Sequence, residues 1–293
     1  MPGSRASRAL PNNRRVLIAA ALGPALAACL LAGCSAGTTR IPAADASPVP
    51  SASGPAEARL VAAALQQDLV SAIKRVLPSV VEIRTNAGLG SGVVLDAKGD
   101  IVTNAHVVDG ASSFQVLSSA AVAGHASGTV PAPLPAVLVG SCPGDDLAVI
   151  RVSAAAGLPP ATFGDLAGVS VGDLVLAIGS PLGLGGSVTE GIVSAIGRSV
   201  AEPASAGNPA AVLPSTIQTS AAINPGNSGG ALVSIDGAVI GIPTLAAVNR
   251  GGAAPGIGFA IPASIAVSVG RQLAGTGRAS SVTAHQACPG QSG

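Results

Sequence analysis

The sequence predicts an all-β domain, an antiparallel sandwich or barrel, and two features of the chain carry this prediction. After Pro78 the apolar residues fall in short runs that end near glycines, as strands separated by turns do. No helical pattern alternates with these runs, which argues against a parallel sheet. The runs are SVVEIRT, GSGVVLD, DIVTNAHVV, AVLVGS, LAVIRVS, DLVLAIGS, GIVSAIGR, ALVSI, AVIGIPTL and GIGFAIP.

Two of the turns between these runs are visible in the sequence itself. In VLDAKGDIV, Lys98-Gly99-Asp100 separates two apolar segments, and in SIDGAVIG, Asp236-Gly237 does the same. Glycine beside a turn-forming polar residue favours a tight connection between antiparallel strands. Both segments therefore predict hairpins.

Helices are expected at the two ends of this domain. Over residues 57–77 apolar residues recur mostly at every third or fourth position, which predicts a helix that ends at Pro78. After Pro262, apolar residues spaced by four predict a closing helix. We expect the globular domain to span residues 57–276 and a tail to follow over residues 277–293.

Composition limits the classes of function that this chain can have. Of the 293 residues, 48% are hydrophobic and 10% are charged, and the net charge is +1. A sizeable core is therefore expected, and binding to nucleic acid is not. With three Phe, no Trp and no Tyr, the core must consist of Val, Ile, Leu and Ala, and platforms for base stacking are nearly excluded.

The amino terminus has the layout of an export signal. Arginines precede VLIAAALGPALAACLLAGC, an uncharged run that begins at Val16. An uncleaved transmembrane helix is the alternative, since about 18 apolar residues are enough to span a bilayer. The preceding NNRRVLI motif leaves Sec and twin-arginine export both open.

The end of this run, LAGC, resembles the bacterial lipobox, in which cleavage before the cysteine leaves its thiol to carry lipid. We therefore expect residues 1–34 to be a lipoprotein signal peptide. A lipid on Cys34 would anchor the exported protein to the outer face of a bacterial cell membrane. Residues 35–56, rich in Ser, Ala and Pro, are expected to form a flexible tether.

The cysteine count is consistent with export. Of four cysteines, Cys29 would leave with the signal peptide and Cys34 would carry lipid, so Cys142 and Cys288 remain as a pair. Outside the cytoplasm these two could form a disulfide, which in the loop-entropy model stabilises by up to roughly 5 kcal/mol. Two unpaired thiols are the alternative.

Three residues in the order His, Asp, Ser are candidates for catalysis. Ser228 lies in AINPGNSGGALV, where a glycine turn can expose a side chain and leave backbone N–H groups free. His106 lies in TNAHVV, and Asp146 opens DLAVI. A serine nucleophile needs a base, a carboxylate that orients the base, and donors for the oxyanion. Each residue alone also fits a structural role.

Taken together, the segments around these residues resemble the HtrA/Deg-like family of trypsin-fold serine proteases. The resemblance covers most of the chain from Ser79 to Pro262, in the order of the family. The matching stretches are GSGVVLDAKGDIVTNAHVV, DDLAVI, GSPLGLGGSVTEGIVSAIGR, IQTSAAINPGNSGGALV and GIGFAIP.

The resemblance implies two packed six-stranded β-barrels with a short helix at each end, divided near residues 155–165. It makes Ser228 the nucleophile, His106 the general base and then acid, and Asp146 the orienting carboxylate, with Asp145 as the less favoured choice. The first barrel would carry the His and the Asp, and the second the Ser. The reaction implied is cleavage of proteins or peptides, with no metal and no cofactor.

The resemblance also implies an oxyanion hole and a substrate pocket. The backbone N–H groups of Gly226 and Ser228 would bind the oxyanion, with the Asn227 peptide held in that loop. Ile223, Pro225 and Thr244 would line the primary pocket. None offers a charge to Lys or Arg, so we expect small or medium aliphatic side chains before the scissile bond.

Several residues depart from the family pattern. Asn227 stands where digestive relatives have an aspartate that pairs with a new amino terminus, so activation by zymogen cleavage is not expected. Ser220 replaces the aspartate of the common QTDAAIN segment, which puts loop anchoring near the pocket in doubt. About 30 residues follow Pro262, so we expect no PDZ domain in this chain. The resemblance leaves a homo-oligomer and a monomer both open.

Three other functions compete with the protease. In an α/β-hydrolase, GNSGG would be the nucleophile elbow, completed by Asp236 and His285. This reading is disfavoured because Asp236 lies in a predicted hairpin and alternating helices are missing. A lipid-anchored chaperone or scaffold with a protease fold and little proteolytic activity is the more serious rival. A purely structural envelope protein is supported only by the predicted anchor.

Overall fold

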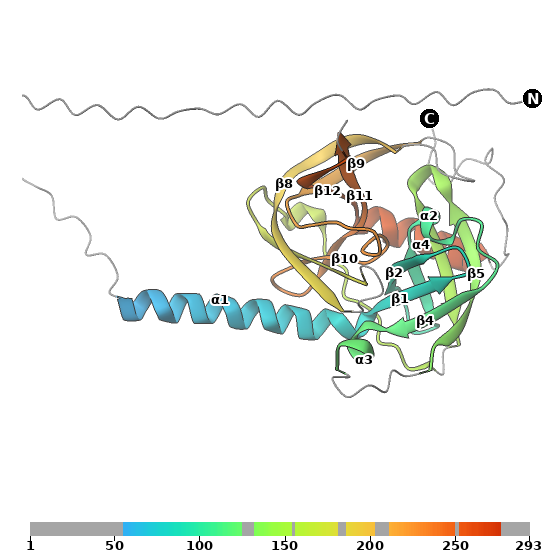
Figure 1. Cartoon of the computed structure of the whole chain (residues 1–293), viewed down its shortest axis with the longest axis horizontal. Coiled ribbons are helices and arrows are strands. Elements are labelled where there is room, and N and C mark those ends of the chain that lie inside the picture. The colour runs from blue at the N-terminus through green and yellow to red at the C-terminus, as the bar shows by residue number, and fades with distance from the viewer. Residues whose placement is uncertain are drawn as a thin grey trace, which may run out of the picture. The chain divides into compact units, whose positions relative to one another are not determined.

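Two closed β-barrels, each of six antiparallel strands, account for most of the residues that the computed structural model describes (Figure 1). The described residues are 55–124, 132–153, 156–180, 186–202, 211–249 and 252–276. They belong to one compact unit that begins at Ser53. The predicted signal peptide, most of the predicted tether, the predicted tail and Cys288 lie outside the described residues.

The first barrel has the strand order β1-β2-β3-β6-β5-β4 and closes through the pairing of β1 with β4. Its interior is aliphatic, as the composition predicts, with Ile83, Ile101 and Ile150 fully buried. Its strands are β1 Val80–Thr85, β2 Leu89–Val94, β3 Asp100–Thr103, β4 Phe114–Ser118, β5 Leu134–Cys142 and β6 Leu147–Val152.

The second barrel has the order β10-β11-β12-β9-β8-β7 and closes through the pairing of β7 with β10. Ile217 and Leu232 are fully buried inside it. Its strands are β7 Leu174–Gly179, β8 Ser187–Glu202, β9 Ala211–Thr219, β10 Ala231–Ser234, β11 Val239–Asn249 and β12 Gly252–Pro262. The predicted all-β fold of two six-stranded barrels is thus confirmed, and the segment between Val152 and Leu174 joins them.

The two predicted hairpins are present. β2 pairs with β3, and β10 pairs with β11, both antiparallel. Gly99 and Gly237 in their turns have φ of 88° and 78°, in the left-handed region that glycine adopts without strain.

The helix before the first barrel, α1 Pro55–Val76, begins two residues earlier than predicted and has 22 residues, so it is not short. Proline is tolerated in a first helical turn because the N–H there has no helical partner. Only the carboxyl-terminal end of α1 packs on the core, where Ala72 and Val76 are buried, whereas Leu60 is 71% exposed.

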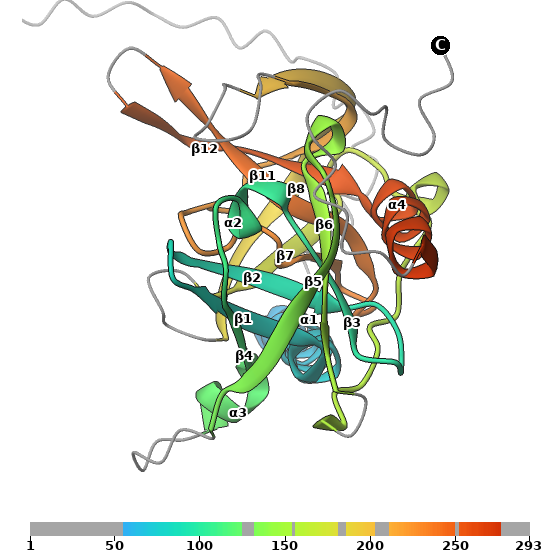
Figure 2. The ribbon, with the colours of Figure 1, turned by 90° about the vertical axis from the view of Figure 1, so that its right-hand side faces the viewer.

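The predicted closing helix is α4 Ala263–Thr276. It packs against β5 and β6 of the first barrel and against β11 of the second (Figure 2). Val269 and Leu273 are buried. α4 therefore helps to join the barrels. The short helices are η1 Leu77–Ser79, α2 Ala105–Val108, α3 Ser119–Gly124, η2 Pro143–Asp145 and η4 Leu166–Gly168. Among the described residues, no helix has both the length and the apolar character needed to cross a membrane.

Candidate active site

His106 lies at the start of α2, directly after the end of β3. Asn104 joins the two elements with an extended backbone, at φ −79° and ψ 150°. Its side-chain amide Nδ2 donates a 2.9 Å hydrogen bond to the carbonyl of Asp146. The segment that carries His106 is therefore tied to the segment that carries Asp146, although 40 residues separate them.

Asp146 lies between η2 and β6, and its side chain is only 2% exposed. Its backbone is left-handed, at φ 48° and ψ 44°, a conformation that Asp and Asn adopt more readily than most residues. The Asp145 carboxylate lies elsewhere, with its Oδ2 3.2 Å from Cys142 Sγ. The turn thus directs the second of the two adjacent carboxylates toward His106.

The imidazole of His106 and the carboxylate of Asp146 are in direct contact. Nδ1 of His106 lies 3.0 Å from both carboxylate oxygens, and the backbone N–H of His106 donates to Oδ1 at 3.1 Å. The hydroxyl of Thr244 donates to Oδ2 at 2.5 Å. Three donors therefore converge on one buried carboxylate, while the His106 side chain is 27% exposed and accessible from the cavity.

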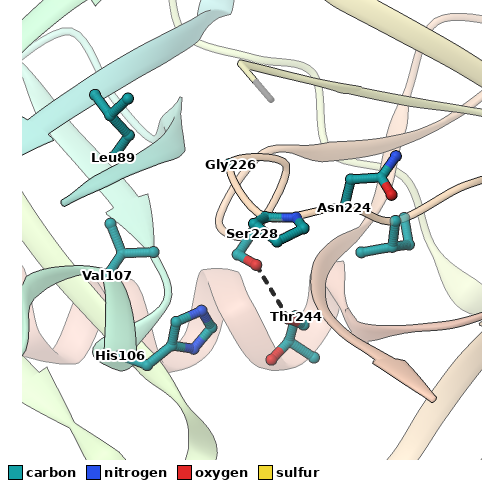
Figure 3. A pocket seen from close by; sticks show the side chains of 9 residues that line it. Leu89, His106, Val107, Asn224, Gly226, Ser228 and Thr244 are labelled. Atoms are coloured by element: carbon teal, nitrogen blue, oxygen red, sulfur yellow. Dashed lines mark hydrogen bonds between the residues drawn. The ribbon is translucent and has the colours of Figure 1, made fainter. Parts of the chain in front are cut away.

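Ser228 comes from the second barrel, in the turn before β10. It lines one cavity together with His106 (Figure 3). Its hydroxyl donates to the carbonyl of Thr244 at 3.1 Å. Thr244 thus contacts Asp146 through its hydroxyl and Ser228 through its carbonyl. The sequence predicts Thr244 only as a pocket residue, because nothing local links it to a carboxylate 98 positions away.

The loop before Ser228 has the conformation that its glycine allows. Gly226 has φ 101°, which a residue with a side chain adopts only with strain. The Asn227 N–H donates to the carbonyl of Asn224 at 2.9 Å, and the Asn227 side chain is buried, with Nδ2 3.3 Å from the carbonyl of Ala222. A compact turn therefore precedes the candidate nucleophile.

His106 and Ser228 line one cavity of about 310 Å³. All three predicted pocket residues line it, and sequence reasoning missed Leu89, Val107 and Asn224. Apart from His106, no lining residue among those described has an ionisable side chain. The lining is Leu89, His106, Val107, Ile223, Asn224, Pro225, Gly226, Ser228 and Thr244.

The doubt about Ser220 is answered by a specific contact. Its hydroxyl accepts a 3.0 Å hydrogen bond from the backbone N–H of Ile192 on β8. Ser220 itself also donates its N–H to the carbonyl of Ile192 at 3.1 Å. The serine therefore anchors the segment that leads to Ile223, at the position where the common family segment has an aspartate.

The α/β-hydrolase reading is wrong, because both sheets are antiparallel barrels. Asp236 lies in the turn between β10 and β11, where its carbonyl accepts a hydrogen bond from Nη1 of Arg75. His285 lies outside the described residues.

Comparisons with known proteins agree with this fold and this arrangement. A family model described as a trypsin-like peptidase domain matches residues 90–242. The chain is similar to serine protease PepD of Mycobacterium tuberculosis, with 41% identity over 70% of this chain and 46% of PepD. It is also similar to periplasmic serine endoprotease DegP of Escherichia coli, with 43% identity over 63% of this chain and 35% of DegP.

A solved structure of the HtrA-type protease AlgW with a tripeptide superposes with a TM-score of 0.59 and 39% identity, over 72% of this chain and 64% of AlgW. The chain spans less than half the length of the two curated relatives. The match to the family model nevertheless covers more than half of the 293 residues. The chain therefore belongs to the trypsin-like peptidase family, and within it to the HtrA-type proteins.

Proposed function

We propose that this protein is a serine endopeptidase that cleaves envelope or misfolded proteins through a covalent acyl-enzyme. The observation that carries the proposal is that His106, hydrogen-bonded to the buried Asp146, lines one cavity together with Ser228. The three residues come from segments far apart in the sequence and from both barrels. A purely structural protein has no need of this combination at the wall of an open cavity.

The proposed roles follow from the hydrogen bonds. A carboxylate only accepts, so Nδ1 of His106 carries the proton that faces Asp146, and Nε2 of the neutral ring is left as an acceptor. After rotation of the Ser228 hydroxyl away from the carbonyl of Thr244, Nε2 takes its proton as Oγ attacks the scissile carbonyl. The protonated ring then gives that proton to the leaving amine.

Water completes the cycle. His106 takes a proton from the water as it attacks the acyl-enzyme, and returns a proton to Oγ of Ser228 when the acid product leaves. In both halves the backbone N–H groups of Gly226 and Ser228 would stabilise the oxyanion, while the Asn227 peptide holds the loop. General base catalysis is worth ~10²- to 10⁴-fold, and each oxyanion donor ~10²- to 10³-fold.

The cavity favours apolar side chains before the scissile bond. Ile223 is 7% exposed and lines the cavity together with Pro225 and Thr244, without an acidic partner for Lys or Arg among the described lining residues. Small or medium aliphatic residues are therefore the expected specificity. Cleavage of a peptide library only after Arg or Lys would overturn this part of the proposal.

Export is supported by the relative named periplasmic and by the amino-terminal pattern. We place the protein on the outer face of a bacterial cell membrane, held by lipid on Cys34, with a disulfide between Cys142 and Cys288. Mass spectrometry of the protein from its host tests both points. A lipid mass that Cys34→Ala removes and a disulfide-linked peptide are expected, whereas an intact leader or free thiols would contradict them.

The catalytic proposal is tested with a fluorophosphonate, which labels an activated serine. The whole chain, purified in detergent, is treated alongside Ser228→Ala and His106→Ala, and the adduct is mapped by mass spectrometry. An adduct on Ser228 that both variants lose supports the protease. A folded protein without an adduct would contradict it and favour the lipid-anchored chaperone or scaffold.

A further inference from the structure

A series of buried polar groups leads from the first barrel to the loop that carries Ser228. It begins at Glu82 on β1, whose side chain is fully buried. Oε1 of Glu82 lies 2.5 Å from Nε of Arg84, and Oε2 accepts a hydrogen bond from the hydroxyl of Ser180. Ser180 directly follows β7 of the second barrel, so a buried carboxylate bridges the two barrels.

The backbone N–H of Ser180 continues the series. It donates to Oγ of Ser91 at 2.9 Å and lies 3.4 Å from the carbonyl oxygen of Gly226. The hydroxyl of Ser91 donates to that same carbonyl at 2.6 Å. Because Oγ of Ser91 already accepts from Ser180, its own proton is directed at Gly226.

Ser91 holds the loop at a second point. Its backbone N–H donates to the carbonyl of Ser228 at 2.9 Å, so one residue of β2 contacts both Gly226 and Ser228. The carbonyl of Ser91 accepts from the hydroxyl of Thr103 at 2.6 Å, at the end of the strand that leads to His106. A Cβ at Gly229 would lie 2.3 Å from the Ser91 carbonyl, so only glycine permits this close approach.

The loop has weak anchoring from its own buried side chain. Oδ1 of Asn227 has no hydrogen-bond partner among the described residues, and Nδ2 makes one long contact, 3.3 Å, to the carbonyl of Ala222. Gly226, at φ 101°, has little intrinsic preference for its conformation. Within the loop, the Asn227 N–H of the same peptide donates to Asn224, and the hydrogen bonds to the Gly226 carbonyl itself come from Ser91 and Ser180, outside the loop.

We propose that Glu82, Ser180 and Ser91 form a positioning relay that holds the carbonyls of Gly226 and Ser228, on either side of Asn227, and so keeps the backbone there in the conformation that aims the Gly226 and Ser228 N–H groups at the oxyanion. The inference rests on the proposed protease function. Glu82 orients Ser180, Ser180 orients the hydroxyl of Ser91, and Ser91 restrains the glycine that would otherwise rotate. None of the three touches the reacting atoms, so they act through the loop.

The direct test is Ser91→Ala in the whole chain, purified in detergent and assayed on a peptide that the wild type cleaves. An oxyanion donor acts mainly in the transition state. We therefore expect kcat to fall about 10- to 100-fold, less than for loss of a donor itself, while KM stays within about twofold. A peptidyl boronate, which forms a tetrahedral adduct on the serine, should bind more weakly by a similar factor.

The matched control is Ser119→Ala. Ser119 is also fully buried near the first barrel, and its hydroxyl has no hydrogen-bond partner among the described residues. This variant loses the same atom at a site away from the loop, so kcat and boronate affinity should match those of the wild type. A decrease equal to that of Ser91→Ala would show that burial of a serine matters, rather than the relay, and would overturn the inference.

Glu82→Gln provides a second, milder test. Glutamine retains one acceptor oxygen for Ser180 but loses the charge, so kcat should fall by about 3- to 10-fold, again with KM nearly unchanged. Normal kcat in both Ser91→Ala and Glu82→Gln would overturn the relay while leaving the protease intact. A folded wild type that neither reacts with fluorophosphonate nor cleaves peptides would instead overturn the protease function itself.

Discussion

Replacing Asp146 with Asn changes one atom of the candidate triad and should leave the fold unchanged. Asn also tolerates the left-handed backbone found there, at φ 48°. The carboxylate now accepts from His106 N–H through Oδ1, from Thr244 through Oδ2, and from Nδ1 of His106 through both. An amide has one oxygen and one NH₂ group, so it cannot satisfy this set.

The same hydrogen bonds favour one orientation of the side-chain amide in Asp146→Asn. The backbone N–H of His106 cannot rotate, so the amide oxygen takes the place of Oδ1. The NH₂ group then occupies the place of Oδ2, where the Thr244 hydroxyl can turn and accept. Its second N–H faces Nδ1 of His106, which must then be unprotonated. The ring proton moves to Nε2, and the base can no longer accept from Ser228.

The expected loss is large. General base catalysis contributes ~10²- to 10⁴-fold, and the same substitution in a known Ser-His-Asp triad lowers kcat by about 10⁴. We expect Asp146→Asn to lower kcat about 10³- to 10⁴-fold, or about 4 to 5.5 kcal/mol in activation free energy. Peptide turnover and the rate of fluorophosphonate labelling measure this, with circular dichroism as the check on folding.

Asp145→Asn is the matched control, because Asp145 is the adjacent carboxylate and its Oδ2 lies against Cys142 Sγ. Its activity should stay within about twofold of the wild type. The reasoning is refuted if folded Asp146→Asn retains more than about a tenth of the wild-type kcat. Equal losses in both variants would show that a general effect of charge operates, rather than the tautomer of His106.

Three further outcomes are expected. In Gly258→Ala the new Cβ would lie 2.5 Å from Cγ1 of Ile223, so the pocket should narrow. In a peptide library, kcat/KM for substrates with Leu before the scissile bond should then fall about tenfold relative to those with Ala there. An unchanged specificity profile would contradict this prediction. Arg151→Leu leaves the buried Asp100 without the two hydrogen bonds that Arg151 donates to it. The free energy of unfolding should fall by about 2 kcal/mol, which lowers Tm by about 4 to 8 °C; solvent screens part of the interaction because Arg151 is partly exposed. The hydrogen bonds that Arg151 donates to Asp100 raise the pKa of Arg151, so Arg151 stays charged through neutral and mildly alkaline pH, and this contribution should be equal in melting curves at pH 6 and 9. Protease activity should fall as the pH drops into the acid range, because a protonated His106 cannot accept a proton from Ser228, and a flat rate from about pH 5 to 8 would contradict the assignment.

The sequence predicted the fold because its information on strands is local. Short apolar runs, glycine turns and the lack of alternating helices are all properties of neighbouring residues, and they were sufficient for an antiparallel β domain. Closure into two barrels came from the resemblance, since closure depends on the pairing of β1 with β4 and of β7 with β10 across long separations. Residues 55 and 56 were assigned to the tether because proline and alanine gave no apolar periodicity there, although the helix begins at Pro55.

The site was predicted less completely, for a related reason. His106, Asp146 and Ser228 lie in segments with recognisable sequence patterns, whereas the residues that hold them do not. Thr244 was expected to line the pocket, but its hydrogen bond to Asp146 joins positions 98 apart, and no local pattern reports such a contact. The contacts of Ser91 are also not predictable from its neighbours, because the GSG segment predicts a strand and not the loop against which that strand packs.

The hydrogen bonds that the sequence did not predict all connect one barrel to the other. Thr244 of the second barrel contacts Asp146 of the first, and Ser91 of the first contacts Gly226 and Ser228 of the second. Neither barrel alone holds the candidate triad and its oxyanion loop in place. Substitutions that remove one of these hydrogen bonds should therefore lower kcat more than they lower Tm, because a buried apolar cluster with residues of both barrels, among them Val93, Leu176 and Val233, keeps the barrels docked without them.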